Sequence, residues 1–204
     1  MTYSCTTRLL MAGAALIVLS GPAFAAIDGN DLLTKINTAY AAGSGVLKAE
    51  AIEVNGNDVV LKGTTFTATG PQEKSIMLGD LTLQDVTEEE GGAYHIDRIE
   101  FPEVNVTEEK TSFSVKDLYL AGVRVPGSTT GNDLNSMMMY EEAHSGPVTV
   151  TKDGKQIFAI EEASGSVALA EDESSMTFEA NVSGISADLS AIDDAKSKET
   201  IDGL

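Results

Sequence analysis

A twelve-residue pattern occurs twice in the chain, as SIMLGDLTLQDV at residues 75–86 and as SFSVKDLYLAGV at residues 112–123. In both copies large apolar residues recur after two positions, then after three, then after two and again after three, and each step of three is a skip in the alternation: Ile76, Leu78, Leu81, Leu83 and Val86 in the first copy, and Phe113, Val115, Leu118, Leu120 and Val123 in the second. Alternation predicts a strand with one buried face. One inserted residue would turn every later side chain to the other face, unless a β-bulge absorbs it. The pattern therefore predicts bent strands with bulges at Gly79-Asp80 and Lys116-Asp117.

Two looser copies lie at residues 59–66 and 94–104, with Lys62-Gly63 and Asp97-Arg98 at the skip. Successive copies are 17, 18 and 19 residues apart, and the turns between them are short and polar. Such turns join antiparallel strands, because parallel strands need crossovers of a dozen or more residues. We therefore expect a mainly β fold, a curved antiparallel meander of long bulged strands with a period of about 18 residues and two or three short covering helices. A parallel β-solenoid of the same period is the structural alternative.

Other segments extend this sheet. The turn pairs Asn55-Gly56 and Asp153-Gly154 predict two hairpins, and apolar residues at 167–169 and 176–182 predict a last pair of strands. Helical spacing at residues 31–42 predicts an amphipathic helix with Asn30 or Asp31 as N-cap.

Two more helices are expected, at residues 133–143 and 189–203. The last one reaches the end of the chain without a stop signal, which is typical of a C-terminally truncated chain.

The segment 133–143 contains a run of four large residues, Met137, Met138, Met139 and Tyr140. Consecutive helical residues lie about 100° apart, so these four side chains would point around most of a helix. Either such a helix sits in a groove, where methionine is a common gap filler, or part of its surface contacts a ligand or partner. These four are the candidate contact residues.

The first 25 residues match a secretory signal peptide, with Arg8 before an apolar run and Ala23-Phe24-Ala25 as the cleavage site. We expect cleavage after Ala25 and one β-rich domain over residues 26–204. Cleavage removes Cys5, the single cysteine. A cysteine-free exported chain is typical of a bacterial periplasmic or secreted protein. The expected mature chain has no apolar stretch long enough to be a transmembrane segment.

Without Arg8 the chain has 12 basic and 32 acidic residues, a net charge of −20. Nucleic acid and anionic lipid headgroups are bound mainly by positive charge, so nucleic-acid binding is excluded. The acidic residues form short runs between the apolar segments, typical of solvated turns. No calcium-loop motif occurs among them.

Recognisable catalytic, cofactor-binding and metal-ligating motifs are absent from the sequence. His95 with Asp97, and His144 with Glu141, are the histidine–carboxylate groupings that a metal could share. An acidic hydrolase site or a metal-binding site is therefore the third functional alternative, and we expect no cofactor and no enzymatic activity.

The export signal, the short N-terminal helix running into AIEVNGNDVVLKGTTF, and the strands LGDLTLQDV and VKDLYLAGV resemble uncharacterised bacterial periplasmic β-repeat proteins. These are distantly similar to AsmA-like envelope proteins. The resemblance covers the pattern of residues 30–190 and implies a curved lipid-handling sheet. It carries no functional residue over to this chain.

Two main hypotheses follow. In the first, a non-enzymatic envelope protein holds a lipid or docks a protein on the apolar face of its sheet. In the second, the chain is a structural or assembly module whose own helices cover that face.

Overall fold

The computed structural model describes residues 26–40, 45–69, 74–130, 136–169, 175–188 and 190. Within them lie one α-helix, α1 (Gly29–Tyr40), and one short 3-10 helix, η1 (Glu90–Gly92). All other regular structure within these residues is β.

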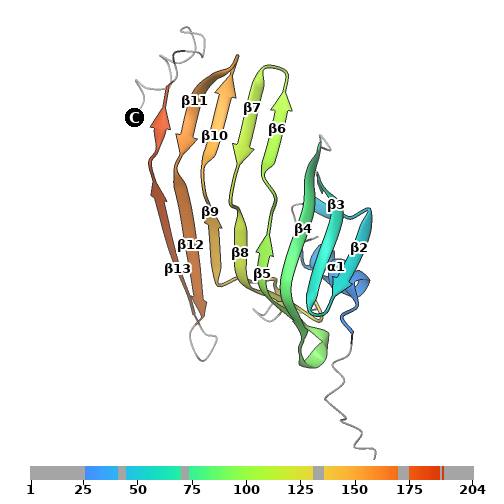
Figure 1. The fold of residues 1–204 in the computed structure, drawn as a ribbon. Coiled ribbons are helices and arrows are strands. Elements are labelled where there is room, and N and C mark those ends of the chain that lie inside the picture. The colour runs from blue at the N-terminus through green and yellow to red at the C-terminus, as the bar shows by residue number, and fades with distance from the viewer. Residues whose placement is uncertain are drawn as a thin grey trace, which may run out of the picture.

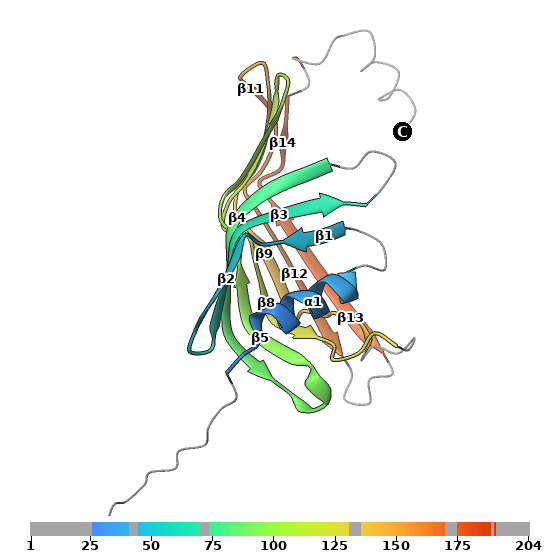
Figure 2. The ribbon, with the colours of Figure 1, turned by 90° about the vertical axis from the view of Figure 1, so that its right-hand side faces the viewer.

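The larger of two sheets has nine strands, in the order β1-β3-β4-β5-β8-β9-β12-β13, with β2 also paired to β3. Its strands are β1 (Gly45–Lys48), β2 (Ala51–Asn55), β3 (Asp58–Ala68), β4 (Lys74–Glu88), β5 (Tyr94–Glu100), β8 (Tyr119–Val125), β9 (Glu142–Ser145), β12 (Glu162–Leu169) and β13 (Met176–Ser183). In Figure 2, α1 lies beside this sheet on the side toward which β3 and β4 bend.

The smaller sheet has the order β14-β11-β10-β7-β6. Its strands are β6 (Val104–Glu108), β7 (Thr111–Val115), β10 (Val148–Lys152), β11 (Lys155–Ile160) and β14 (Ser186–Ala187). Each of them is the direct continuation in sequence of a strand of the larger sheet, so five extended segments pass from one sheet into the other (Figure 1).

The mainly β, antiparallel character predicted from the sequence is confirmed. Every strand pair is antiparallel, which excludes the parallel solenoid. The hairpin at Asp153-Gly154 forms as predicted, with Lys152 paired to Lys155. The hairpin of β2 and β3 turns through Gly56-Asn57, one residue later than predicted.

The first copy of the repeated pattern forms one continuous strand, β4. Leu81, Leu83 and Val86 are buried while Met77 is exposed, so the predicted phase is correct. The predicted bulge lies between β3 and β4, where the register shifts between Leu61 and Thr64. Asp80 stabilises it by accepting hydrogen bonds from the Gly63 N–H and from Lys62 Nζ, both at 2.9 Å.

Skips of the pattern fall at the same level in three neighbouring strands: the second skip of β4, the skip at Asp97-Arg98 of β5 and the second skip of β8. Leu83 pairs with Ile99 and Val86 with Ile96, and the same two isoleucines pair with Leu120 and Val123. Because all three strands skip together, the register is unchanged across the skip. Asp85 and Gly122 take positive φ angles of 46° and 58° there, which returns the apolar side chains to the buried face.

The second copy of the pattern has a different structure. Its first half is β7 and its second half is β8, so Lys116 and Asp117 lie at the break between the two sheets. Asp117 has φ 51°, consistent with the predicted local kink. Phe113, predicted to face a core, is 40% exposed, because the smaller sheet has few covering elements in the part of the chain that the structure describes.

The helix predicted at residues 31–42 is present as α1. Its N-cap prediction was wrong: the Asp28 carboxylate, rather than that of Asp31 or the amide of Asn30, accepts hydrogen bonds from the N–H groups of Asn30 and Asp31. Leu32 and Ile36 of α1 are buried.

The prediction of a helix at residues 133–143 is wrong for the part that the structure describes, from residue 136 onward. Met139 makes two backbone hydrogen bonds with Arg124, and the Glu141 N–H donates to the Ala121 carbonyl oxygen. These backbone groups are therefore paired with β8, and β9 begins at Glu142. We expected two or three covering helices, but among the described residues α1 is the one α-helix. Apart from residue 190, the helix predicted at 189–203 lies outside them.

The main core lies between α1 and the larger sheet. It consists of buried residues from α1, β3, β4, β5 and β8: Leu32, Ile36, Val59, Leu61, Leu81, Leu83, Val86, Tyr94, Ile96, Ile99, Val123 and Val125.

Candidate functional site

The helix α1 is attached to the sheet near its beginning by a polar cluster. The Tyr94 hydroxyl donates to Asp31 Oδ2 at 2.8 Å, and the Lys35 ammonium contacts the same carboxylate and donates to the Gly92 carbonyl oxygen. Hydrogen bonds from Lys35 and Tyr94 lower the pKa of Asp31. Burial and the Asp31 charge raise the pKa of Tyr94 well above its ordinary value. The Tyr94 hydroxyl therefore ionises at a higher pH than that of an ordinary tyrosine.

A second attachment lies further along α1. The Asn37 side chain donates from Nδ2 to the Leu47 carbonyl oxygen at 2.8 Å and accepts from the Leu47 N–H at 2.7 Å. Leu47 belongs to β1, the short strand at one edge of the larger sheet. The helix is thus attached to β1 as well as to the region of β5.

Beside this second attachment lies a cavity of about 220 Å³ that is partly open to solvent. It is lined by α1, by strands of the larger sheet and by Met138. The lining residues, all apolar, are Ile36, Gly45, Leu47, Leu61, Phe66, Leu78, Leu81, Leu83, Ile99, Phe101, Leu120 and Met138.

The absence of polar side chains from this lining decides what the cavity can hold. Water inside it would find few hydrogen-bond partners, because an ordered water typically makes two to four such bonds. An apolar occupant would instead cover apolar side chains that otherwise face water, which is favourable.

Of the four predicted contact residues, only Met138 lines this cavity, and both Met138 and Tyr140 pack against the core. Met139 forms an isolated antiparallel bridge with Arg124 of β8. Met137 is 57% exposed.

All four residues line a second depression of about 260 Å³, together with Val167, Met176 and Phe178. The structure brings the four residues of the run together at this depression, from an extended segment rather than from a helix.

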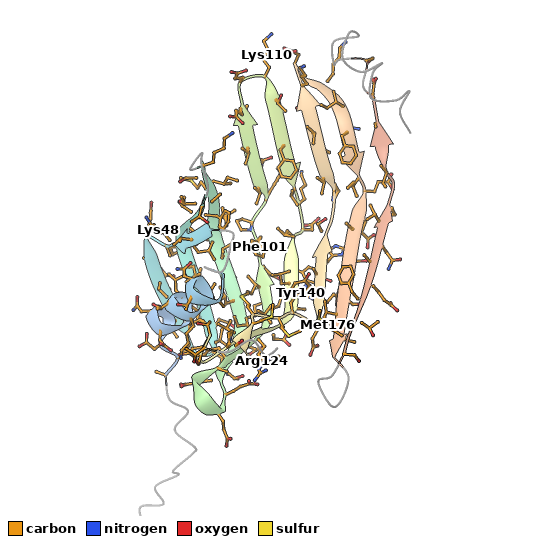
Figure 3. All side chains as sticks on the ribbon, turned by 180° about the vertical axis from the view of Figure 1, so that it is seen from behind. Lys48, Phe101, Lys110, Arg124, Tyr140 and Met176 are labelled. Carbon is orange, nitrogen blue, oxygen red and sulfur yellow. The ribbon has the colours of Figure 1, made fainter. Side chains whose placement is uncertain are left out.

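The face of β12 and β13 next to this depression is apolar and open to solvent. Phe178 is 61% exposed and Val182 is 50% exposed, and β13 is the last strand of the larger sheet. Figure 3 looks onto this side of the molecule: the labelled Phe101, Tyr140 and Met176 follow one another across the sheet, away from α1 and toward β13. Among the described residues, α1 covers only the other end of this face.

A polar cluster occupies the opposite face of the larger sheet and is the second candidate. The Tyr119 hydroxyl donates to Glu142 Oε1 at 2.7 Å, which raises the pKa of Tyr119. The Tyr119 ring stacks on His144 at 4.9 Å between centroids and on the Arg98 guanidinium. These side chains connect β5, β8 and β9 across the sheet. The arrangement is that of a cross-strand stack that stabilises the sheet.

The two histidines proposed as metal ligands lie apart. His95 is in β5, opposite Arg124, whereas His144 is in β9, opposite Tyr119. Glu162 Oε1 is 3.8 Å from His144 Nδ1. In the part of the chain that the structure describes, no group of three histidine, aspartate or glutamate side chains is placed to hold a metal ion.

Sequence reasoning missed the cavity itself. Leu61, Phe66, Leu78, Leu81, Ile99, Phe101 and Leu120 carry the apolar pattern that predicted the strands, but nothing in that pattern distinguishes a filled core from a core with a cavity. The open face of β13 could have been found, since Met176, Phe178, Ala180 and Val182 alternate with polar residues.

None of the helices that the structure describes is both long and apolar enough to cross a membrane. Comparisons of the chain with protein-family models, with known proteins and with solved structures gave no significant match.

Proposed function

We propose that this protein is a non-enzymatic, exported envelope protein that binds an apolar ligand between α1 and the curved, one-sided larger sheet. The observation that carries the proposal is the cavity of about 220 Å³ whose lining residues are all apolar. Ligand sites are typically concave and mostly apolar.

Two further features support this function. The cavity lies beside an exposed apolar face on β12 and β13, and a monomer rarely exposes a contiguous apolar patch unless the patch is used. The signal-peptide pattern of residues 1–25, which the structure does not describe, supports export to the periplasm or beyond. A distant relationship to AsmA-like envelope proteins would fit both features.

The test uses two tryptophan substitutions on neighbouring residues of β4. The chain has no tryptophan, so each introduced indole is a unique fluorescent reporter. Leu78 lines the cavity, whereas Met77 is 74% exposed. Leu78→Trp should occupy part of the cavity, while Met77→Trp, the matched control, should leave it unchanged.

The ligand probe is N-phenyl-1-naphthylamine, whose fluorescence rises in an apolar site. We expect the wild-type protein and Met77→Trp to bind it with dissociation constants within about twofold of each other, and Leu78→Trp to bind at least about tenfold more weakly. Native mass spectrometry of protein purified from its own compartment should also show a bound apolar molecule.

The structural or assembly module is the competing outcome. If no variant binds the probe, no apolar molecule co-purifies, and Leu78→Trp raises the melting temperature by filling a void, the ligand-binding proposal is rejected in favour of a structural role.

A further inference from the structure

We propose that the ligand is a long, unbranched hydrocarbon chain that runs from the cavity past Met138 onto the open face of β12 and β13. This inference rests on the proposed function and specifies its ligand class. Met138 lines both the cavity and the second depression, so the two spaces are neighbours on either side of one side chain.

The two spaces also lie on the same face of the sheet. Leu120, which lines the cavity, pairs with Ala143, Ala143 pairs with Gly165, and Gly165 pairs with Ala180. Directly paired residues of antiparallel strands share a face. Phe178, two residues from Ala180, therefore shares that face with Leu120.

Size favours one elongated ligand over two small ones. Neither the cavity of about 220 Å³ nor the depression of about 260 Å³ reaches the roughly 300 Å³ at which typical ligand sites begin. Together they fall within that range. Met138 between them is a flexible side chain that can change rotamer to admit a chain.

The chemistry of the lining favours a hydrocarbon chain over a peptide or a charged group. Apart from the hydroxyl of Tyr140, the side chains that line the two spaces carry no hydrogen-bonding oxygen or nitrogen. A peptide would bring N–H and C=O groups that need partners, and an anionic headgroup would be buried without a counter-charge. The headgroup therefore stays in water, at the open end near Met176 and Phe178.

The experiment measures displacement of N-phenyl-1-naphthylamine by alkyl maltosides of eight and fourteen carbons, each below its critical micelle concentration. The maltose head is uncharged and too large to enter the cavity. If the bound hydrocarbon chain extends beyond Met138, each methylene added between eight and fourteen carbons should tighten binding of the maltoside by about threefold to fourfold, as burial of a methylene predicts.

Two substitutions in β13 test where the far end of the bound hydrocarbon chain lies. Phe178→Gln removes an apolar residue that lines the depression, whereas Val182→Gln changes a residue of the same strand and face that lines neither space. Both side chains are at least half exposed, so both variants should keep the wild-type melting temperature. We expect Phe178→Gln to weaken binding of the fourteen-carbon maltoside by at least about fivefold and of the eight-carbon maltoside by less than twofold. Val182→Gln should change neither by more than twofold.

The outcomes separate this inference from the proposed function. Failure of both maltosides and of the probe to bind rejects the proposed function. Binding of both chain lengths with equal affinity, or with no effect of Phe178→Gln, keeps the cavity as a ligand site but overturns the extended path. Equal weakening by Phe178→Gln and Val182→Gln overturns it too, because the chain would then lie unspecifically on β13. Displacement by phosphatidylcholine vesicles as well as by maltosides would support a membrane phospholipid as the source of the chain, and displacement by maltosides alone would support a single-chain lipid.

Discussion

Asn37 of α1 makes two hydrogen bonds with the backbone of Leu47 in β1, one to the carbonyl oxygen and one from the N–H. One side-chain amide thus serves both backbone groups of a residue that lines the apolar cavity. The position of the helix over the cavity therefore depends on one residue at this end and on the Asp31–Tyr94–Lys35 cluster at the other.

The first prediction concerns this contact. Asn37→Ala should lower the free energy of unfolding by about 1–3 kcal/mol, because two partly buried backbone groups lose their partner. Thr38→Ala, one residue on, removes only an exposed hydroxyl that bonds within the helix and should stay within about 0.5 kcal/mol. Urea denaturation of both variants checks the difference, and equal losses would mean that the Asn37 contact contributes little.

The second prediction distinguishes the two copies of the repeated pattern. Leu81 is 2% exposed, so Leu81→Ala should cost on the order of 2–5 kcal/mol, while Thr82→Ala on the other face should cost less than about 1 kcal/mol. Leu118, the corresponding residue of the second copy, is only partly buried at the break between the sheets. Leu118→Ala should therefore cost clearly less than Leu81→Ala in the same urea melts. An equal cost would show that the two copies are packed alike in solution.

The third prediction concerns the methionine run. In an extended segment the effects of substitution should alternate from one residue to the next. Met138→Gln places an amide among core residues and should lower the free energy of unfolding by about 1–3 kcal/mol. Met137→Gln should change it by less than about 0.5 kcal/mol, since that side chain is already exposed. Thermal melts of the two variants are sufficient. Similar losses at both positions would favour the helix predicted from sequence over the observed strand-like segment.

The fourth prediction is a pH dependence at the β3–β4 bulge. The Gly63 N–H and then Lys62 lower the pKa of Asp80 below its ordinary value of 3.8. The unfolded chain then binds more protons than the folded one in this range, so stability rises with pH. The contribution of Asp80 is present above about pH 4 and is lost as pH falls through the lower folded value.

Asp80→Asn should therefore reduce the dependence of the urea midpoint on pH between about pH 5 and pH 2. Lys62→Met should reduce it by less, because the hydrogen bond from Gly63, the larger cause of the shift, remains. A wild-type pH slope in Asp80→Asn would contradict the assignment.

The fifth prediction concerns processing. If Ala23-Phe24-Ala25 is the cleavage site, exported protein should begin at Ala26, two residues before the Asp28 cap of α1. Mass spectrometry of the exported N-terminus tests this, and an N-terminus at Met1 or Met11 on exported protein would exclude cleavage after Ala25.

The sequence by itself determined the elements that depend on local chemistry. The alternation around Leu81 and Leu83 set a one-sided strand, Gly63 and Asp80 marked a bulge, and Asp153-Gly154 set a two-residue turn. In each case a few adjacent residues are sufficient to determine the structure, because they set either an alternation of period two or a positive φ angle. The amphipathic helix over residues 31–42 was predictable for the same reason.

Only the tertiary structure decided how distant segments meet. The methionine run has helix-forming residues, yet pairing of Met139 with Arg124 holds it extended, because tertiary hydrogen bonds override a propensity of a few tenths of a kcal/mol per residue. The two copies of one pattern became a continuous strand and a strand broken between two sheets, since their partners differ. The cavity is a space left between α1 and the sheet, and the volume left unfilled depends on the positions of both elements rather than on the apolar pattern of either.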